Sequence, residues 1–365
     1  MIFSLVLLLW LLASALAEYD AGDAAGYLRL NAVAVCEDRR IAGWNCGRQC
    51  STTAALVENG SQVLIGPTPV YNLHGFVARL RREGSSSCVV AIAGTSFYNW
   101  RNIRADLEFW RTKWPTWSGS CADWCYGCEV MKGFASSYQE LRDEIFASLE
   151  QLKCSAVTFT GHSLGGAIAV LASLEARACH NFTVSVWTYG MPRVGNLAFV
   201  EAYVSTAKQR QQSPPMWRIT RDFDLIPQLP QTWLGYYHIP WAVRYWKHGT
   251  EKVICTERYE DPDCTYAGGT MADHHNYFGV TGTDENQASL DCISQSALKS
   301  KRDQFFAWRA GFCTAMVFAS LLCCGSCCGC CFLLCQGRQR LKFNPTEVQC
   351  HLLGDETDSS DSGKV

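Results

Sequence analysis

The alternation of apolar and polar positions is clearest in the middle of the chain. Residues 157–160 (VTFT) form a β-branched, apolar run that predicts a buried strand. Residues 167–178 are mostly apolar good helix formers and predict a helix. Only the short stretch GHSLGG separates the two segments. The pattern therefore predicts a strand, a tight turn that carries a serine, and a helix that begins at once.

Three other segments have a regular pattern. Residues 88–93 predict an apolar strand that ends at Gly94, and residues 217–220 predict another core strand. In residues 97–110, apolar side chains fall at helical spacing on one side and charged ones occupy the rest, which is typical of a surface helix. The apolar positions of this helix are Phe97, Trp100, Ile103, Leu107 and Trp110.

Long apolar runs lie near both ends of the chain. Residues 1–17 end in Ala-Leu-Ala, which favours a signal peptide removed after Ala17 over an uncleaved anchor helix. Residues 312–335 contain no charged residue and, at about 1.5 Å per residue, can cross the hydrocarbon core. Basic residues follow this run, as expected for a cytoplasmic flank. We expect a signal peptide (1–17), a lumenal or extracellular body (18–300), a Cys-rich transmembrane segment (312–335) and a cytoplasmic tail (336–365).

The overall composition narrows the class of protein. The chain has 365 residues, 48% of them hydrophobic, and a formal net charge of −2. This length allows a sizeable core in one large domain or two small ones. The balanced charge gives no electrostatic reason to expect a nucleic-acid partner. No period of about twenty to fifty residues stands out, which argues against a repeat protein.

The 21 cysteines form two groups. An even number, twelve, lies between the signal peptide and the predicted span, which favours disulfides in an oxidising compartment. The others lie in or after the span, where they could face lipid or be S-acylated. A metal-binding cluster is the alternative there, but His and acidic ligands are missing. Two sequons in the body predict glycosylation at Asn59 and Asn181.

The serine of the central turn lies in a motif that is typical of a catalytic nucleophile. Residues 161–165 match G-x-S-x-G between a strand and a helix, the context of a nucleophile elbow, in which Ser163 takes a strained backbone conformation. A serine hydroxyl needs a base and an orienting acid, and in this scaffold the chain order is Ser, acid, His. The downstream candidates, between which spacing does not choose, are the acids Asp222 and Asp224 and the bases His274 and His275.

Several ordered motifs between about residues 30 and 292 resemble the class 3 lipase family, of which secreted fungal triacylglycerol lipases are members. The resemblance implies an α/β-hydrolase fold, an α/β architecture with a central, mostly parallel sheet. The matching motifs are GHSLGGA at 161–167, TYGMPRVGN at 188–196, DLIPQLP at 224–230, GYYHIPWAVRYW at 235–246 and HHNYFG at 274–279.

The resemblance also assigns roles to the candidates. It implies that Asp224 is the acid, with Asp222 a solvated turn residue. It implies that His274, three residues before Tyr277, is the base, with His275 as the alternative. His238, in the aromatic hairpin, is interpreted as a packed or hydrogen-bonded loop histidine.

The resemblance also implies two further parts of the site, the oxyanion donors and a lid. The backbone N–H of Leu164, next to the nucleophile, should donate to the oxyanion. The family's turn after an early strand implies that Thr95, or its neighbour Ser96, is the second donor. The helix at 97–110 follows that turn, where the family's lid lies. We therefore expect its apolar residues to cover the site in water and to bind lipid when open.

Some disulfides are expected from the same resemblance. A short family loop corresponds to Cys125 and Cys128, and a second close pair to Cys46 and Cys50. The tie between the N-terminal helix and the end of the domain corresponds to Cys36 and Cys292, while Cys255 and Cys264 could close a hairpin. Pairing stays open for Cys88, Cys121, Cys154 and Cys179.

The sequence thus predicts a serine ester hydrolase for triacylglycerol or partial glycerides. It would need no metal or organic cofactor and would meet its lipid substrate at a membrane or lipid-droplet interface. We expect a single-span protein of the cell surface, endosome or lysosome, or otherwise a secreted enzyme. The alternatives are a phospholipase A1 or feruloyl-type esterase, and a catalytically silent receptor or adhesion protein with the same fold.

Overall fold

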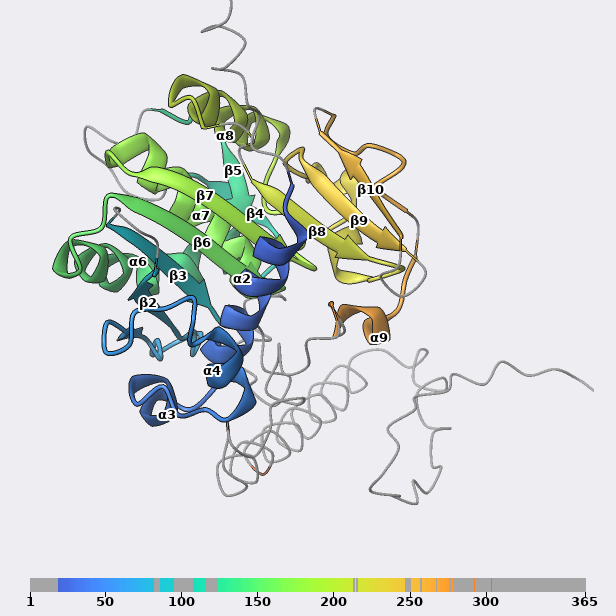
Figure 1. Ribbon diagram of the computed structural model, residues 1–365. Coiled ribbons are helices and arrows are strands. Elements are labelled where there is room, and N and C mark those ends of the chain that lie inside the picture. Colours follow the sequence, from blue (N-terminus) through green and yellow to red (C-terminus); the bar gives the residue numbers. More distant parts are fainter. Residues whose placement is uncertain are drawn as a thin grey trace, which may run out of the picture. The chain divides into compact units, whose positions relative to one another are not determined.

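The computed structural model covers most of the predicted body (Figure 1). The described residues are 19–81, 86–94, 108–115, 124–212, 214, 216–246, 251–256, 258–266, 268–275, 277–278, 292 and 303. All of them belong to the first of two units, Met1–Trp308 and Arg309–Val365. The predicted signal peptide, transmembrane segment and tail lie outside the described residues. Within the described part of the chain, no helix is long and apolar enough to cross a membrane.

A sheet of eight strands organises the body, in the order β1-β2-β3-β6-β7-β8-β9-β10. The strands from β3 to β9 are parallel, whereas β1, β2 and β10 add antiparallel pairings at the edges. The predicted mostly parallel sheet is confirmed. Its strands are β1 (Val63–Ile65), β2 (Gly75–Arg79), β3 (Ser87–Ile92), β6 (Ala156–His162), β7 (Thr183–Tyr189), β8 (Trp217–Arg221), β9 (Ala242–Trp246) and β10 (Glu251–Cys255).

Helices cover both faces of the sheet, with α2 in front and α7 behind it in Figure 1. A separate antiparallel pair, β4 (Arg111–Lys113) and β5 (Glu129–Met131), leads into α6. The helices are α2 (Ala21–Ala34), α3 (Asp38–Ala42), α4 (Arg48–Thr53), α6 (Lys132–Gln151), α7 (Leu164–Cys179), α8 (Leu197–Gln209) and α9 (Met271–His274), with 3₁₀ turns at Ile226–Gln228 and Thr232–Leu234.

Strands β2, β3 and β7 supply side chains to two separate cores, because successive residues of a strand point to opposite faces. In β3, Val90 and Ile92 join the core beneath α6, α7 and α8. Val89 and Ala91 join the core beneath α2 and α4. This burial on both faces explains why residues 88–93 form an unbroken apolar run rather than an alternating one.

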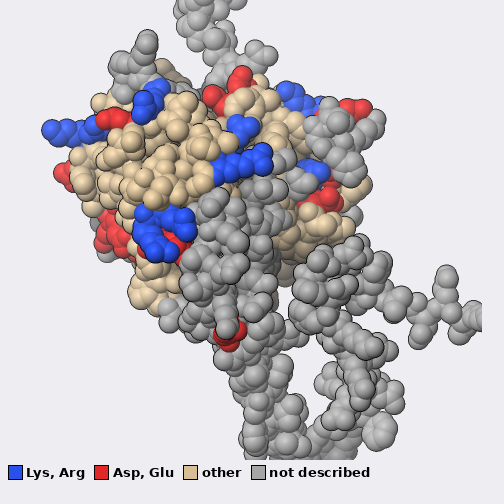
Figure 2. All heavy atoms as spheres, turned by 60° about the horizontal axis from the view of Figure 1, so that its bottom comes forward, with Lys and Arg blue, Asp and Glu red and all other residues tan. Residues whose placement is uncertain are grey.

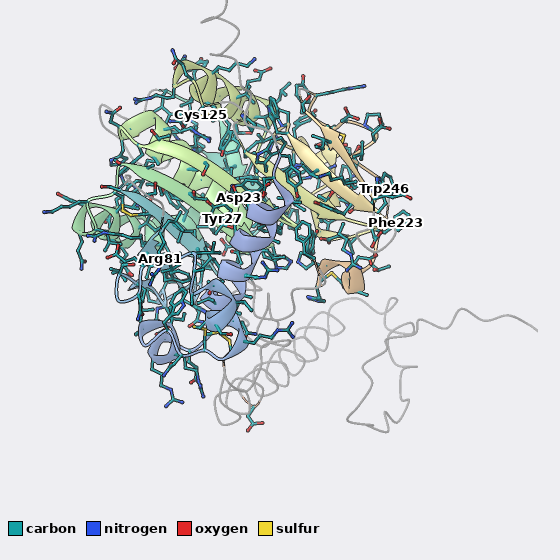
Figure 3. All side chains as sticks on the ribbon, viewed as in Figure 1. Asp23, Tyr27, Arg81, Cys125, Phe223 and Trp246 are labelled. Carbon is teal, nitrogen blue, oxygen red and sulfur yellow. A yellow bond between two sulfur atoms is a disulfide. The ribbon has the colours of Figure 1, made fainter. Side chains whose placement is uncertain are left out.

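Helix α2 is attached to the sheet by polar as well as apolar contacts. Its Asn31 donates to the Thr160 hydroxyl at 2.7 Å, and both residues are buried. Tyr27, labelled where α2 crosses the sheet in Figure 3, stacks on Trp187 with ring centroids 5.6 Å apart. Asp20 caps the N-terminus of the helix, and its carboxylate accepts from the N–H of Asp23. These contacts hold α2 against the strand that leads to Ser163.

The predicted elements agree with the observed ones where both can be compared. The strand predicted at 157–160 is part of β6, the one at 217–220 is part of β8, and the one at 88–93 is β3. The helix predicted at 167–178 begins earlier, at Leu164 directly after the serine. The helix predicted at 97–110 is the exception: residues 97–107 lie outside the described residues, and residues 108–110 are not helical.

The disulfides bear out all four expected pairs: Cys36–Cys292, Cys46–Cys50, Cys125–Cys128 and Cys255–Cys264. A fifth bond joins Cys88 to Cys154, linking the start of β3 to the turn before β6. Cys179 is disulfide-bonded as well. Both predicted glycosylation sites, Asn59 and Asn181, are exposed.

The charged residues in the view of Figure 2 form no single-sign field. Lys and Arg side chains alternate there with Asp and Glu over a largely uncharged surface. This distribution agrees with the formal net charge of −2. It gives no support to a polyanionic partner on the visible part of that face.

Candidate active site

Ser163 lies in a sharp turn between β6 and α7. Its backbone has φ 54° and ψ −127°, a conformation that costs energy for a residue with a side chain. The turn is held because the Ser163 N–H donates to the Tyr189 carbonyl of the neighbouring strand at 2.9 Å. Leu164 is the first residue of α7, so the helix N-terminus and its unpaired N–H groups lie directly beside the serine. The turn has the geometry that is predicted for a nucleophile elbow.

The two glycines of the motif allow β6 and α7 to cross at backbone contact. A Cβ atom on Gly161 would lie 2.1 Å from the Gly165 carbonyl, and one on Gly165 would lie 2.3 Å from the Ile92 carbonyl. A Cβ on Gly94, at the exit of β3, would lie 3.0 Å from the His162 carbonyl. The exit of β3, from which the predicted oxyanion donor follows, therefore adjoins the elbow.

Asp224 is held by four hydrogen bonds from three residues. It lies after β8, is fully buried, and both carboxylate oxygens are 2.9 Å from Nδ1 of His274. The N–H of Ile226 donates to one oxygen at 2.9 Å, and the Tyr277 hydroxyl donates to the other at 2.5 Å. Such a carboxylate fixes the orientation of the imidazole and keeps the Nε2 atom on the opposite side of the ring.

His274 ends the short helix α9 and is 1% exposed. Thr270 caps the N-terminus of this helix: its hydroxyl accepts from the N–H of Asp273, and its backbone pairs with residue 224. This pairing carries His274 to the end of β8. Of the two late histidines, His274 is the one that contacts Asp224, as the family resemblance implies.

His162 and Gly190 lie against His274. The Nε2 atom of His162 is 2.8 Å from the His274 carbonyl oxygen, and the two rings are 4.4 Å apart. A Cβ on Gly190 would lie 2.8 Å from both Asp224 and His274, and Gly190 has φ 56°. Among the described residues no hydrogen bond joins Ser163 to His274, and such contacts commonly tighten when substrate binds.

Burial sets the protonation of two groups around the pair. It lowers the pKa of His162, and the nearby His274 lowers it further, so His162 is neutral and its Nε2–H donates. Burial, and then the charge of Asp224, raises the pKa of Tyr277. Tyr277 therefore remains a protonated donor to the carboxylate.

A cavity of about 440 Å³ opens beside Ser163. Apart from Ser163 and Gln231 its lining is apolar and comes from the segments around residues 109, 131, 192 and 226–234. Phe109 and Trp233, which line it, are 55% and 78% exposed. The cavity can therefore take a long apolar group with its end at the serine.

Of the remaining predicted site residues, only some belong to the described part of the chain. Thr95, Phe97, Trp100, Ile103 and Leu107 lie outside the described residues. Trp110 is described and 51% exposed, and its ring lies 5.3 Å from the Lys132 ammonium. In the part of the chain that is described, no group of three or more His, Cys, Asp or Glu residues could hold a metal ion.

Two other expectations can be compared with the structure. Asp222 is a turn residue with φ 37°, but it is only 9% exposed and pairs with Arg221, so the expectation of a solvated side chain is wrong. The carbonyl of this residue accepts from buried Arg244, which draws the turn inward. His238 is fully buried and hydrogen-bonded to the Pro227 carbonyl, as predicted.

Sequence reasoning did not identify several residues of the site. Tyr277 was part of a motif without an assigned function, although its spacing from His274 was a signal. Gly190, in the motif that follows β7, also had no assigned contact. The cavity lining at residues 226–234 is irregular, with two 3₁₀ turns, and leaves no periodic pattern in the sequence.

Comparisons with known proteins agree with this geometry. Residues 89–233 match the family described as Lipase (class 3). A lipase of Rhizomucor miehei is 32% identical over 253 residues, covering 66% of this chain and 63% of that protein. Secreted mono- and diacylglycerol lipase 1 of Fusarium solani is 32% identical over 198 residues, covering 53% of this chain and 54% of that protein. The chain thus spans less than two thirds of the length of these relatives.

Solved structures give the same result for the fold. The native propeptide complex of Rhizomucor miehei lipase has a TM-score of 0.57 and 28% identity, covering 72% of this chain and 81% of that one. A triacylglycerol lipase with a serine protease triad as its catalytic centre has a TM-score of 0.57 and 29% identity, covering 72% and 96%. The fold and elbow define an α/β-hydrolase. Over residues 89–233 the chain is similar to the class 3 lipase family.

Proposed function

We propose that the protein is a serine carboxylic ester hydrolase that acts on lipid acyl esters, namely triacylglycerol or partial glycerides. One observation carries the proposal: the buried Asp224–His274 pair lies beside a strained serine elbow that opens into an apolar cavity. The relatives support it, since they are lipases, one of them a mono- and diacylglycerol lipase. The exposed aromatic edge of the cavity favours a lipid substrate over a soluble phenolic ester.

In the proposed reaction Ser163 attacks the ester carbonyl while His274 accepts its proton through Nε2. His274 then donates that proton to the leaving alcohol, and water releases the fatty acid from the acyl-enzyme by the same path in reverse. Asp224 holds Nδ1–H and stabilises the imidazolium that forms. No step of this sequence calls on a metal or organic cofactor.

The negative charge that develops on the carbonyl oxygen needs fixed donors. We assign one to the backbone N–H of Leu164 at the start of α7, and the second to Thr95. Each such donor is worth about 3 kcal/mol in the transition state. The segment 97–110 would act as the lid, with its apolar side over the cavity in water.

We also propose that the enzyme is lumenal or extracellular and held by one span. The observed disulfides support an oxidising compartment for the body. The uncharged stretch 312–335 with its basic flank supports the span, and residues 1–17 support secretory targeting. Extraction of membranes with alkaline carbonate tests this: a protein released to the supernatant is not anchored by a span.

Substrate profiling of the wild type beside Ser163→Ala tests the activity. We expect wild-type protein to hydrolyse glycerides faster than phospholipids or short soluble esters. The variant should keep its unfolding temperature and lose ester hydrolysis by about 1,000-fold or more, because the nucleophile is gone. A fluorophosphonate should label only the wild type. Folded wild-type protein that reacts with neither ester nor fluorophosphonate would instead support a silent receptor.

A further inference from the structure

Residues 224–230, here called the acid loop, connect the two halves of the proposed site. Asp224 stands at its start, and Leu229 and Pro230 near its end line the cavity beside Ser163. Little regular structure supports this loop, which contains one 3₁₀ turn at Ile226–Gln228. Its backbone carbonyls must therefore find partners elsewhere.

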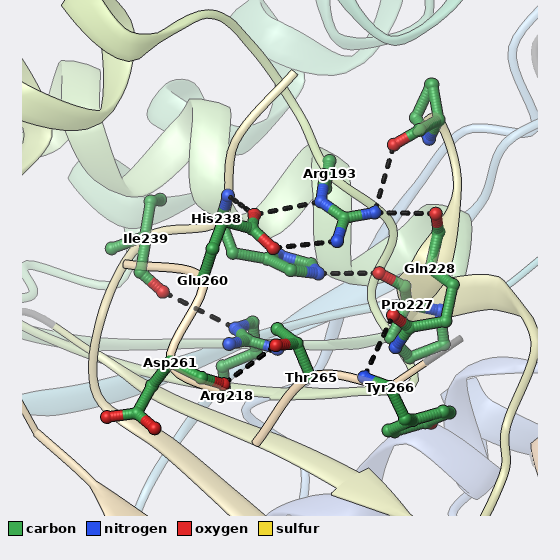
Figure 4. Close-up of polar contacts among 11 residues, drawn as sticks. Arg193, Arg218, Pro227, Gln228, His238, Ile239, Glu260, Asp261, Thr265 and Tyr266 are labelled. Carbon is green, nitrogen blue, oxygen red and sulfur yellow. Dashed lines mark hydrogen bonds and ion pairs between the residues drawn. The ribbon is translucent and has the colours of Figure 1, made fainter. Parts of the chain in front are cut away.

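Arg193, from the segment that follows β7, supplies those partners near the end of the loop (Figure 4). Its Nη1 donates to the carbonyls of Gln228 at 2.5 Å and Pro230 at 3.1 Å. Its backbone N–H donates to the Leu229 carbonyl at 2.8 Å. One residue thus holds three consecutive carbonyls directly behind the cavity wall. A planar guanidinium on a fixed backbone can do this because its donors form a rigid fork.

Glu260 fixes the guanidinium from the other side. Its carboxylate accepts from Nε and Nη2 of Arg193 at 2.8 and 2.7 Å. It also accepts from the N–H of His238 at 2.7 Å, and His238 in turn contacts the Pro227 carbonyl at 2.6 Å. The Arg193 and Glu260 side chains are 5% and 18% exposed. Burial opposes ionisation of Glu260, yet hydrogen bonds from Arg193 lower its pKa, so the pair is charged.

A different residue holds the start of the loop. The Tyr266 hydroxyl donates to the Asp224 carbonyl at 2.7 Å. The Tyr266 ring also covers the guanidinium of Arg244, 4.0 Å from its centroid. The two ends of the acid loop therefore have separate anchors, one at the acid and one at the cavity wall.

We propose that the Arg193–Glu260 pair is a positioning device that sets the shape of the acyl cavity and so determines selectivity for long acyl chains. This inference rests on the proposed ester hydrolase function. A buried ion pair contributes little net stability compared with apolar residues of similar volume, so a geometric role accounts for its presence better than a stabilising one. Arg193 touches no reacting atom in this role.

The test compares kcat/KM for p-nitrophenyl dodecanoate and butanoate in the same detergent. In Arg193→Lys and Glu260→Gln, we expect the dodecanoate-to-butanoate ratio to fall about tenfold, as when a pocket loses a few apolar contacts. Arg193→Lys combined with Glu260→Gln should lose no more than the worse single variant, because the two residues act as one unit. Tyr266→Phe should slow both esters equally.

Arg142→Lys is the matched control. Arg142 forms a comparable pair with fully buried Glu175 at 2.5 Å, between α6 and α7 and away from the acid loop. Its ratio should equal that of the wild type. An unchanged ratio in folded Arg193→Lys and Glu260→Gln, or an equal fall in Arg142→Lys, overturns the proposal. Wild-type protein unreactive toward both esters would instead remove the proposed function.

A measurement on the wild type covers the case in which the variants do not fold. Hydrogen exchange is followed at the N–H groups of Arg193 and Leu229, after labelling with a dodecyl or an ethyl fluorophosphonate. The chain in the cavity should slow exchange at these groups more for the dodecyl than for the ethyl label. Equal exchange with both labels contradicts the proposed link between the cavity wall and Arg193.

Discussion

His162 and His238 illustrate how the body keeps histidines neutral close to the proposed base. Each is buried, and each donates Nε2–H to a carbonyl, that of His274 or that of Pro227. Burial is the main cause that lowers both pKa values, with His274 acting further on His162, and Arg218 and Arg193 acting further on His238. A proton on the Nδ1 atom of either residue would put a positive charge in a buried environment that opposes it.

This neutrality predicts a pH dependence of stability. The unfolded chain takes up a proton at each histidine as the pH falls below about 6.5, and the folded protein does not. The stabilising contribution is therefore fully present above that pH and is lost as the pH falls. The free energy of unfolding should decrease by about 1.4 kcal/mol per pH unit for each residue. Thermal unfolding from pH 7.5 to 5 measures the slope.

Glutamine is the matched replacement, because its amide can donate where Nε2–H does and does not titrate. His162→Gln and His238→Gln should each flatten the pH slope by a similar amount, and the double variant by their sum. A slope that survives both replacements would assign the pH dependence to other groups.

At the scale of elements, the crossing of β6 and α7 determines where Ser163 points. The crossing depends on Gly161 and Gly165, whose missing Cβ atoms leave room for backbone contact. Gly161→Ala or Gly165→Ala should destabilise the protein by about 3 kcal/mol or more, because backbone rather than a flexible side chain would have to move. Urea unfolding at neutral pH gives the change in free energy.

Gly26→Ala in α2 is the control for this prediction. The nearest atom to a Cβ there is the flexible end of Leu56 at 3.3 Å, and alanine favours the helix by up to about 1 kcal/mol. The variant should remain within about 1 kcal/mol of the wild type. Equal effects in Gly26→Ala and Gly161→Ala would mean that the crossing is looser than the contacts indicate.

The sequence was sufficient for elements that carry their own local pattern. The run at 157–160, the glycines of the elbow and the order of Ser163, Asp224 and His274 are all visible without coordinates. The run and the glycines depend on contacts between neighbours in the chain, whereas the order of the three residues follows from the chain order of the scaffold. The family resemblance then chose between Asp222 and Asp224, which spacing alone could not.

Other features depend on pairs that are distant in sequence. Arg193 and Glu260 are 67 residues apart, and nothing in the sequence around either residue indicates that the two form an ion pair. The burial of Asp222 was missed for the same reason, since Arg244, distant in sequence, donates to its carbonyl and draws this turn inward. The irregular cavity wall at 226–234 follows neither a helical nor a strand period. Such features become visible only when the sheet order is known.

At the scale of the whole molecule, disulfides attach the segment of His274 to the body on both sides. Before it, Cys264 is bonded to Cys255 at the end of β10. After it, Cys292 is bonded to Cys36, and its carbonyl accepts from the N–H of Glu37 at 3.1 Å. His274 thus belongs to a stretch whose two ends are fixed, although α9 itself has only four residues.

This arrangement predicts a large effect of removing the long-range bond. Cys36–Cys292 spans 256 residues and Cys46–Cys50 spans four. Loop-closure entropy gives stabilisations of about 5.5 and about 2 kcal/mol respectively. Replacing Cys36 and Cys292 by alanine should therefore lower the free energy of unfolding by about 4 kcal/mol more than replacing Cys46 and Cys50.

The same pair of variants distinguishes a general loss of stability from a loss at the site. Below both unfolding temperatures, fluorophosphonate labelling of Ser163 should slow in the variant without Cys36 and Cys292, because His274 loses one fixed end of its segment. Labelling should stay at the wild-type rate without Cys46 and Cys50, a pair that joins α4 to the turn before it. If the two variants label equally fast, Asp224 and Tyr277 alone are enough to hold His274 in place.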